Sequence, residues 1–305
     1  MRLLLQFVLI LAPRRTRRHP GGCCWHDPRI PQALSGDASN GRSLPALAGL
    51  HSDDQAALAG AVAILEGTSL PVRLAALVGG SVEALKRRLP EAAQRMIDGA
   101  VRRALETAMG AAMRSDPARN PTPLSGSWLH RGLLAASGAA GGAFGLPGTL
   151  VELPVSTTLL LRRIAAIAAE EGEDLSDPLI QAECLQVFAL GGRDPADTEA
   201  ESGYFVLRIA LTEALKGAVG RGLGAMLPGF LGAIAARFGG PVALKLSAQA
   251  APVVGAAGGA AVNIAFLEHF SGIARAHFTI RRLERVHGPA LVKAGYEAIR
   301  RGTAA

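Results

Sequence analysis

Aromatic residues are scarce in this 305-residue chain and make up only 4% of it. Long stretches in which apolar and polar residues alternate are also missing. Half-buried β-strands need that alternation and favour aromatic and β-branched residues, so the sequence argues against a β-sheet. Alanine, glycine and leucine dominate instead, and 49% of the residues are hydrophobic. We therefore expect an all-α fold, a single multi-helix domain that buries one large core.

Cysteine is almost absent, with three residues at Cys23, Cys24 and Cys184. Two adjacent cysteines and a distant third do not build a disulfide framework, so a reducing, cytoplasmic compartment fits best. The C-x₂₋₄-C spacing of a zinc site is missing, and so are the G-x-x-x-x-G-K-[ST], G-x-S-x-G and H-E-x-x-H motifs. We expect neither a metal nor a cofactor.

Positive charge is concentrated at the start of the chain. The net charge is +7, but residues 1–45 hold seven arginines and two aspartates, so residues 46–305 are nearly neutral. A nucleic-acid-binding protein would carry a basic stripe on its folded surface, so we expect no nucleic-acid partner. We interpret residues 1–45 as a disordered basic arm. The alternative is a membrane-surface anchor that combines the apolar run Leu3–Ala12 with the arginines that follow it.

Helical patterns divide residues 46–305 into three parts. Residues 46–114 contain the N-terminal helices, and proline, serine and asparagine in residues 115–127 predict a linker. Residues 128–305 form the core, in which Asp177 is the expected N-cap of one helix. The last long helix is expected over residues 253–286, before a Gly-Pro stop signal.

Glycine is in excess in the core. The twenty residues of Gly132–Val151 contain six glycines and no charge, and Leu246–Leu267 is also uncharged. Glycines four positions apart share one helix face, and a second helix backbone can approach them closely. Because glycine inside a helix costs about 1 kcal/mol relative to alanine, we expect these positions to be helix contacts. The pairs at this spacing are Gly138 and Gly142, Gly141 and Gly145, and Gly255 and Gly259.

These uncharged blocks fit three environments. They can form a buried, closely packed helix pair in a soluble protein, or insert shallowly at a membrane surface. A full membrane span is disfavoured, because Pro147 interrupts the first block and Gln249 and Asn263 interrupt the second. The sequence leaves the first two environments open.

Polar residues interrupt the apolar face of the last long helix. At 100° per residue, Asn263, His277, Arg281 and Glu284 lie on or beside one stripe. One interpretation is a structural hydrogen-bond network that fixes the register of the helix. A second is a polar pocket in which Arg281 holds an anionic group and His277 transfers protons. A third is an exposed helix end.

Arg162 lies inside an apolar helix that is expected over residues 155–169. A buried guanidinium needs an acidic partner, and the nearest candidate upstream is Glu152. The sequence therefore predicts a structural ion pair between these two residues.

Five motifs of the core occur in a recognisable order and spacing. They are GGAFGLPGTLVELP, LRRIAAIAAEEG, GGRDPADTEAESGYF, PVVGAAGGAAVN and ARAHFTIRRLERVHG. In these motifs the chain resembles the EcsC family over roughly residues 80–300, and residues 1–45 have no counterpart in it.

The resemblance implies a helical bacterial protein that is cytoplasmic or peripheral on the inner face of the membrane. The family is named for a protein encoded beside the subunits of a bacterial ABC transporter, and no catalytic residues carry over from it. We therefore expect a non-enzymatic accessory protein whose partner is a membrane surface or a membrane transporter. The alternative is a hydrolase-like enzyme with a polar pocket on the last long helix. An oligomeric state is not predicted.

Overall fold

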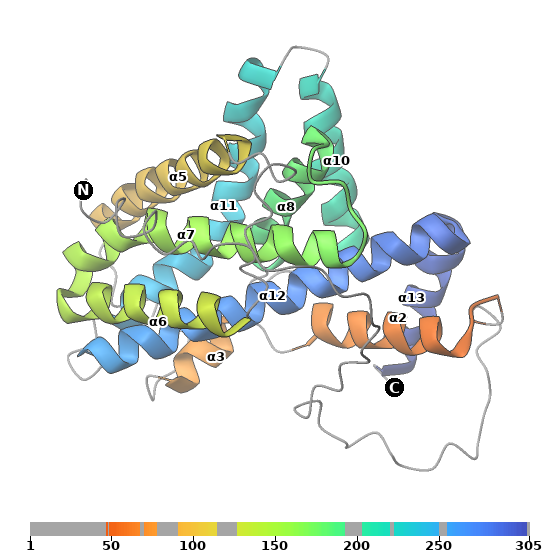
Figure 1. Ribbon diagram of the computed structural model, residues 1–305, viewed down its shortest axis with the longest axis horizontal. Helices are drawn as coiled ribbons and strands as arrows, with labels where there is room; N and C mark the ends of the chain where they lie inside the picture. The colour runs from red at the N-terminus through yellow and green to blue at the C-terminus, as the bar shows by residue number, and fades with distance from the viewer. Residues whose placement is uncertain are drawn as a thin grey trace, which may run out of the picture. The chain divides into compact units, whose positions relative to one another are not determined.

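The computed structural model describes residues 47, 49–67, 70–77, 91–114, 127–192, 203–219, 223–249 and 255–303. The predicted arm over residues 1–45 and nearly all of the predicted linker over residues 115–127 lie outside them. The described residues confirm the all-α prediction, with ten helices and no strand among them (Figure 1). The helices are α2 (Ser52–Leu65), α3 (Leu70–Leu77), α5 (Glu91–Arg114), α6 (Ser127–Ala143), α7 (Gly145–Glu170), α8 (Pro178–Leu190), α10 (Tyr204–Val219), α11 (Leu223–Gln249), α12 (Gly255–His287) and α13 (Pro289–Thr303).

Helix α12 is the element around which most of the other helices pack. It contacts α2, α3, α6, α7, α8, α11 and α13 (Figure 1). Its buried residues, among them Phe266, Phe270 and Phe278, lie on more than one side of the helix. A helix that is apolar around much of its circumference must be covered from several directions, which explains its central place. The predicted range, 253–286, differs from the observed one by two residues at the start and one at the end.

The contact between α6 and α12 is made by glycines. A methyl group placed on Gly142 would lie 3.0 Å from the Cα of Gly259 and closer still to the carbonyl oxygen of Gly255. One placed on Gly138 would collide with the carbonyl oxygen of Gly259 and lie 2.7 Å from Nδ2 of Asn263. Backbone therefore meets backbone at this crossing, and a side chain on either helix would force the two apart.

The other predicted glycines meet different needs. At Gly255 an added methyl group would have no atom within 4 Å, but its φ of +45° favours glycine. The prediction that Gly141 and Gly145 share one helix face is wrong, because a turn at Phe144 separates α6 from α7. The turn puts Pro147 in the first turn of α7, where a missing N–H breaks no helical hydrogen bond.

Helix α7 continues through Pro154, although the sequence predicts a helix that starts only at residue 155. The proline removes one backbone hydrogen bond from the helix. The hydroxyls of Thr157 and Thr158 donate to the carbonyl oxygens of Leu153 and Pro154, each at 2.8 Å. Since α7 packs against α5, α6, α8 and α12, tertiary contacts hold the helix together across the proline.

Helix α8 is fixed at both ends. As predicted, Asp177 caps its start, and the carboxylate accepts a hydrogen bond from the N–H of Leu179 at 2.8 Å. Near its other end, Phe188 packs against Phe238 of α11 and Phe270 of α12, with ring centroids 4.7 and 5.4 Å away. These contacts place the polar residues of α8 against α12.

Candidate functional site

Five polar side chains from α6, α7, α11 and α12 meet in a group that we call the Glu152 cluster: Ser137, Glu152, Ser156, Lys245 and Asn263. Nζ of Lys245 donates to Oε2 of Glu152 at 2.8 Å and to Oγ of Ser156 at 3.1 Å. The other carboxylate oxygen accepts hydrogen bonds from Ser137 at 2.7 Å and from Asn263 at 2.8 Å. The cluster therefore joins four helices through one carboxylate.

The Glu152 cluster is a charged pair inside the core. Burial raises the pKa of Glu152, but the ammonium of Lys245 and the hydrogen bonds outweigh it, so the pKa lies below its ordinary value. The same ammonium lies 5.6 Å from the centre of the Phe266 ring. Nδ2 of Asn263 donates to Glu152 and to the carbonyl oxygen of Leu134, which fixes its amide. The cluster sets how the four helices pack and presents no exposed reactive group.

Glu152 pairs with Lys245 and not with Arg162, so the predicted ion pair is wrong. The cause is the continuity of α7, because ten residues of helix separate the two positions by about 15 Å along the axis. The buried arginine of this helix is Arg163, which binds Glu170 at 3.1 Å.

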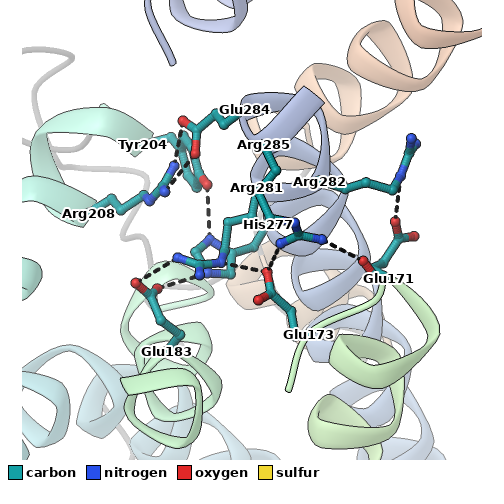
Figure 2. Close-up of polar contacts among 10 residues, drawn as sticks. All are labelled: Glu171, Glu173, Glu183, Tyr204, Arg208, His277, Arg281, Arg282, Glu284 and Arg285. Atoms are coloured by element: carbon teal, nitrogen blue, oxygen red, sulfur yellow. Dashed lines mark hydrogen bonds and ion pairs between the residues drawn. The ribbon is translucent and has the colours of Figure 1, made fainter. Parts of the chain in front are cut away.

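A second group of side chains, which we call the Glu183 cluster, connects α12 to its neighbours (Figure 2). Its members are Glu173, Glu183, Tyr204, Arg208, His277, Arg281 and Glu284. Nε2 of His277 lies 3.1 Å from Oε2 of Glu183, and Nδ1 lies 2.9 Å from the hydroxyl oxygen of Tyr204. Arg281 donates to the other oxygen of Glu183 at 2.9 Å. His277 of α12 thus lies between α8 and α10, and Arg281 lies against α8.

Ion pairs flank this centre on two sides. Arg208 of α10 binds Glu284 of α12 through two hydrogen bonds of 2.8 and 2.7 Å. Nε of Arg281 donates to Glu173 at 2.8 Å, and Arg285 contacts the same carboxylate (Figure 2). Charge-assisted bonds of this kind are about twice as strong as neutral ones. They tie α12 to α10 and to the loop between α7 and α8.

The protonation states in the Glu183 cluster follow from these contacts. Burial lowers the pKa of His277, and Arg208 and Arg281 act in the same direction, against the carboxylate of Glu183. The ring is therefore neutral at pH 7. Burial raises the pKa of Glu183, but its bond with His277 and the charge of Arg281 bring it below its ordinary value. Because an ionised carboxylate can only accept, Nε2 carries the ring proton and the Tyr204 hydroxyl donates to Nδ1.

The polar residues predicted on one stripe of α12 fall into two places. His277, Arg281 and Glu284 belong to the Glu183 cluster, whereas Asn263 belongs to the Glu152 cluster, about 21 Å from His277 along the helix. Arg281 binds acidic residues of the chain itself, and the side chain of His277 is 0% exposed. This geometry favours the structural network over a pocket for an anionic substrate.

The residues that bind His277 and Glu152 are not predicted from the sequence. Glu183 and Tyr204 lie 94 and 73 residues from His277, a separation that no helical period reveals. Lys245 had a clearer signal, since it is the only charged residue in residues 238–267. A lone charge within a long apolar segment requires an opposite charge inside the fold.

Apolar side chains are exposed where α6 meets α7. Phe144, in the turn, is 77% exposed, and Val151, in the second turn of α7, is 73% exposed. Phe144 is the N-cap residue of α7, so Val151 lies about two helical turns, or about 10 Å, farther along the same helix. The start of α12 adjoins them through the contact of Gly142 with Gly255, on the left of the view in Figure 1. We call this surface the uncharged end. Among the residues whose exposure the structure describes, its exposed ones are Ala140, Ala143, Phe144, Val151, Gly255, Ala256 and Ala257.

No individual helix among the described residues is both long enough and apolar enough to cross a membrane. Helices α2 and α3 meet the requirements of length and composition only as a pair, bent by 60° at the break between them.

Comparison with known proteins gives one match. The model of the EcsC protein family matches residues 127–283, just over half of the chain. No curated protein and no solved structure matches the chain significantly. The matched segment holds the Glu152 cluster, the uncharged end and all but one residue of the Glu183 cluster.

Proposed function

Because the chain belongs to the EcsC protein family, we propose that it is a non-enzymatic accessory protein that works at a membrane surface. The observation that carries this proposal is the exposure of Phe144 and Val151 on the uncharged end. Large apolar side chains that are exposed together, without charges among them, mark an interaction surface.

The uncharged end suits a weak, reversible attachment to a bilayer. Removing a phenylalanine or valine side chain from water contributes about 1.5–3 kcal/mol when burial is complete. Two such side chains support an association constant on the order of 10²–10⁴ M⁻¹. Attachment of this strength needs only shallow insertion into the boundary between headgroups and acyl chains.

The buried clusters support a non-enzymatic role. A general acid or base must reach the substrate directly or through one water molecule. His277 is fully buried and has a hydrogen-bond partner at each ring nitrogen, and Arg281 and Glu284 bind charged residues of the chain. The hydrolase-like alternative would require these bonds to open before any substrate could bind.

The inner face of a bacterial membrane is the proposed location, and an ABC transport system is the proposed partner. The name of the family supports this partner, since it comes from a protein encoded beside such a transporter. A membrane-surface contact would keep the protein close to a transporter, even though the protein itself does not span the bilayer in this proposal.

Flotation of the full chain with lipid vesicles tests the proposal. Phe144→Asp and Val151→Asp are expected to lower the floated fraction, because each places a carboxylate at the contact. Val286→Asp is the matched control, since Val286 is 65% exposed but lies about 46 Å along α12 from Gly255. The proposal is wrong if the wild-type chain floats with neither neutral nor anionic vesicles, or if all three variants float as well as the wild type.

A further inference from the structure

We infer that the uncharged end binds loosely packed, electrically neutral lipid and does not recognise anionic headgroups. The inference rests on the proposed function and specifies which property of a membrane the same surface detects. It follows from the distribution of charge along three helices, from the rigidity of their crossing and from the size of the exposed side chains.

Charges are distant from the uncharged end on each of its three helices. The first charged residue of α6 counted back from Phe144 is Arg131, and the first of α12 is Glu268. Each lies about 20 Å along its helix from this surface. On α7, Glu152 is buried against Lys245, and the next charge, Arg162, lies about 16 Å beyond Val151. Shallow insertion reaches about 5–10 Å, so these helices can enter that far without burying an exposed charge.

The described parts of α6, α7 and α12 offer no exposed charge close to the uncharged end for electrostatic recognition. Anionic lipids attract proteins through lysine and arginine near the headgroups, and that attraction weakens within a Debye length of about 8–10 Å. Arg131 and Arg162 both lie farther than that from Phe144 and Val151 along their helices. Binding through these three helices therefore depends on the space that lipids leave for apolar side chains.

The uncharged end is held in one shape by the structure beneath it. The backbone contact between Gly142 and Gly259 fixes α6 against α12. One residue after Val151, the carboxylate of Glu152 is bonded to groups from three other helices. A surface with this support does not have to fold on binding, but it also cannot spread to cover more lipid. Phe144 and Val151 can only enter gaps of about their own size.

Gaps of that size are frequent where lipids are unsaturated or the bilayer is strongly curved. Binding of apolar faces at membrane interfaces depends on curvature and on lipid composition for this reason. The structure thus assigns a lipid-packing preference to the uncharged end. A second copy of the chain is a different occupant of the same surface, and the experiment below separates the two.

The test uses the full chain with three kinds of vesicle, each at low and at high salt. They are small vesicles of unsaturated phosphatidylcholine, large vesicles of saturated phosphatidylcholine, and large vesicles that contain phosphatidylglycerol. Neutral lipid offers nothing to the arginines of residues 1–45. The loss of binding in Phe144→Asp then separates the uncharged end from the apolar run Leu3–Ala12 without any truncation. We expect the wild type to float with the small neutral vesicles at both salt concentrations. The partition coefficient of Phe144→Asp for the same vesicles should be at least about tenfold lower than that of the wild type.

The outcomes are distinct. Flotation with anionic vesicles alone, released by salt, would overturn the inference but leave a membrane-surface function in place. Equal flotation with loosely and tightly packed neutral vesicles would overturn the packing preference in the same way. Flotation with no vesicle, together with a dimer in sedimentation that Phe144→Asp dissociates, would overturn both and identify a second copy as the occupant. Val151→Ser removes an apolar side chain without introducing a charge. If Val151→Ser and Phe144→Asp both melt at the wild-type temperature and both lose flotation, the loss reflects lost apolar contact and not misfolding.

Discussion

Lys245 of α11 and Glu152 of α7 form an ion pair inside the helical core, with 2.8 Å between Nζ and Oε2. Their side chains are 1% and 6% exposed. Glu152 directly follows Val151 of the uncharged end, and the same carboxylate receives hydrogen bonds from α6 and α12. The ion pair therefore stabilises the packing of the four helices that support the uncharged end.

Lys245→Met is expected to destabilise the chain by about 3–5 kcal/mol, because it leaves the Glu152 carboxylate buried without a counter-charge. Adding Glu152→Gln should recover much of this loss, since the neutral amide no longer needs one. Urea unfolding of the wild type, both single variants and the double variant gives the coupling energy. Strictly additive effects of the two substitutions would show that the ion pair does not connect α7 to α11.

Gly142→Ala and Gly259→Ala are expected to destabilise the chain by about 1–3 kcal/mol, because each methyl group would meet backbone atoms at 3.0 Å or less. Gly132→Ala on α6 and Gly60→Ala on α2 are the controls. At these two positions an added methyl group has no atom within 4 Å, so alanine should stabilise the helix by up to about 1 kcal/mol. Thermal unfolding measures all four, and a common sign would refute the proposed backbone contact.

The free energy of unfolding is expected to fall as the pH drops from about 6.5 to about 4. Burial lowers the pKa of His269 to about 4, although its hydrogen bond to the carbonyl oxygen of Gly191 acts in the opposite direction. The unfolded chain takes up the proton near pH 6.5, so acid favours unfolding in this range, by up to about 3 kcal/mol. Burial of His277 contributes with the same sign.

His269→Gln tests the assignment of this pH dependence. Glutamine can still donate to Gly191 but does not titrate, so the variant should lose less stability than the wild type between pH 7 and pH 4. Urea unfolding at both pH values provides the comparison. Equal losses in the two proteins would assign the acid sensitivity to other groups.

The sequence predicts well those features that depend on local pattern. The span of α12 and the Asp177 cap of α8 follow from helical periodicity and from the chemistry of helix ends. Glycine spacing also indicates closely packed positions at Gly138, Gly142 and Gly259, but it does not identify which helix approaches them.

Tertiary partners account for what the sequence interpretation missed. The stripe of α12 includes both His277 and Asn263, which lie about 21 Å apart along the helix. The two side chains bind groups on different helices. The predicted pair of Glu152 with Arg162 fails because the sequence suggests a break at Pro154, where packing keeps α7 intact. Long-range pairing of this kind is fixed by the fold as a whole and leaves little trace in local periodicity.

A polarity-sensitive fluorophore at position 151 gives the most direct test of the membrane-contact claim. Val151→Cys and Val286→Cys are labelled in a chain in which Cys23 and Cys24 are serine, while the buried Cys184 stays unlabelled. On addition of small neutral vesicles, we predict a blue shift of the emission at position 151 and none at position 286. An unchanged spectrum at position 151 while the protein floats with the vesicles, or an equal shift at both positions, would contradict membrane contact through the uncharged end.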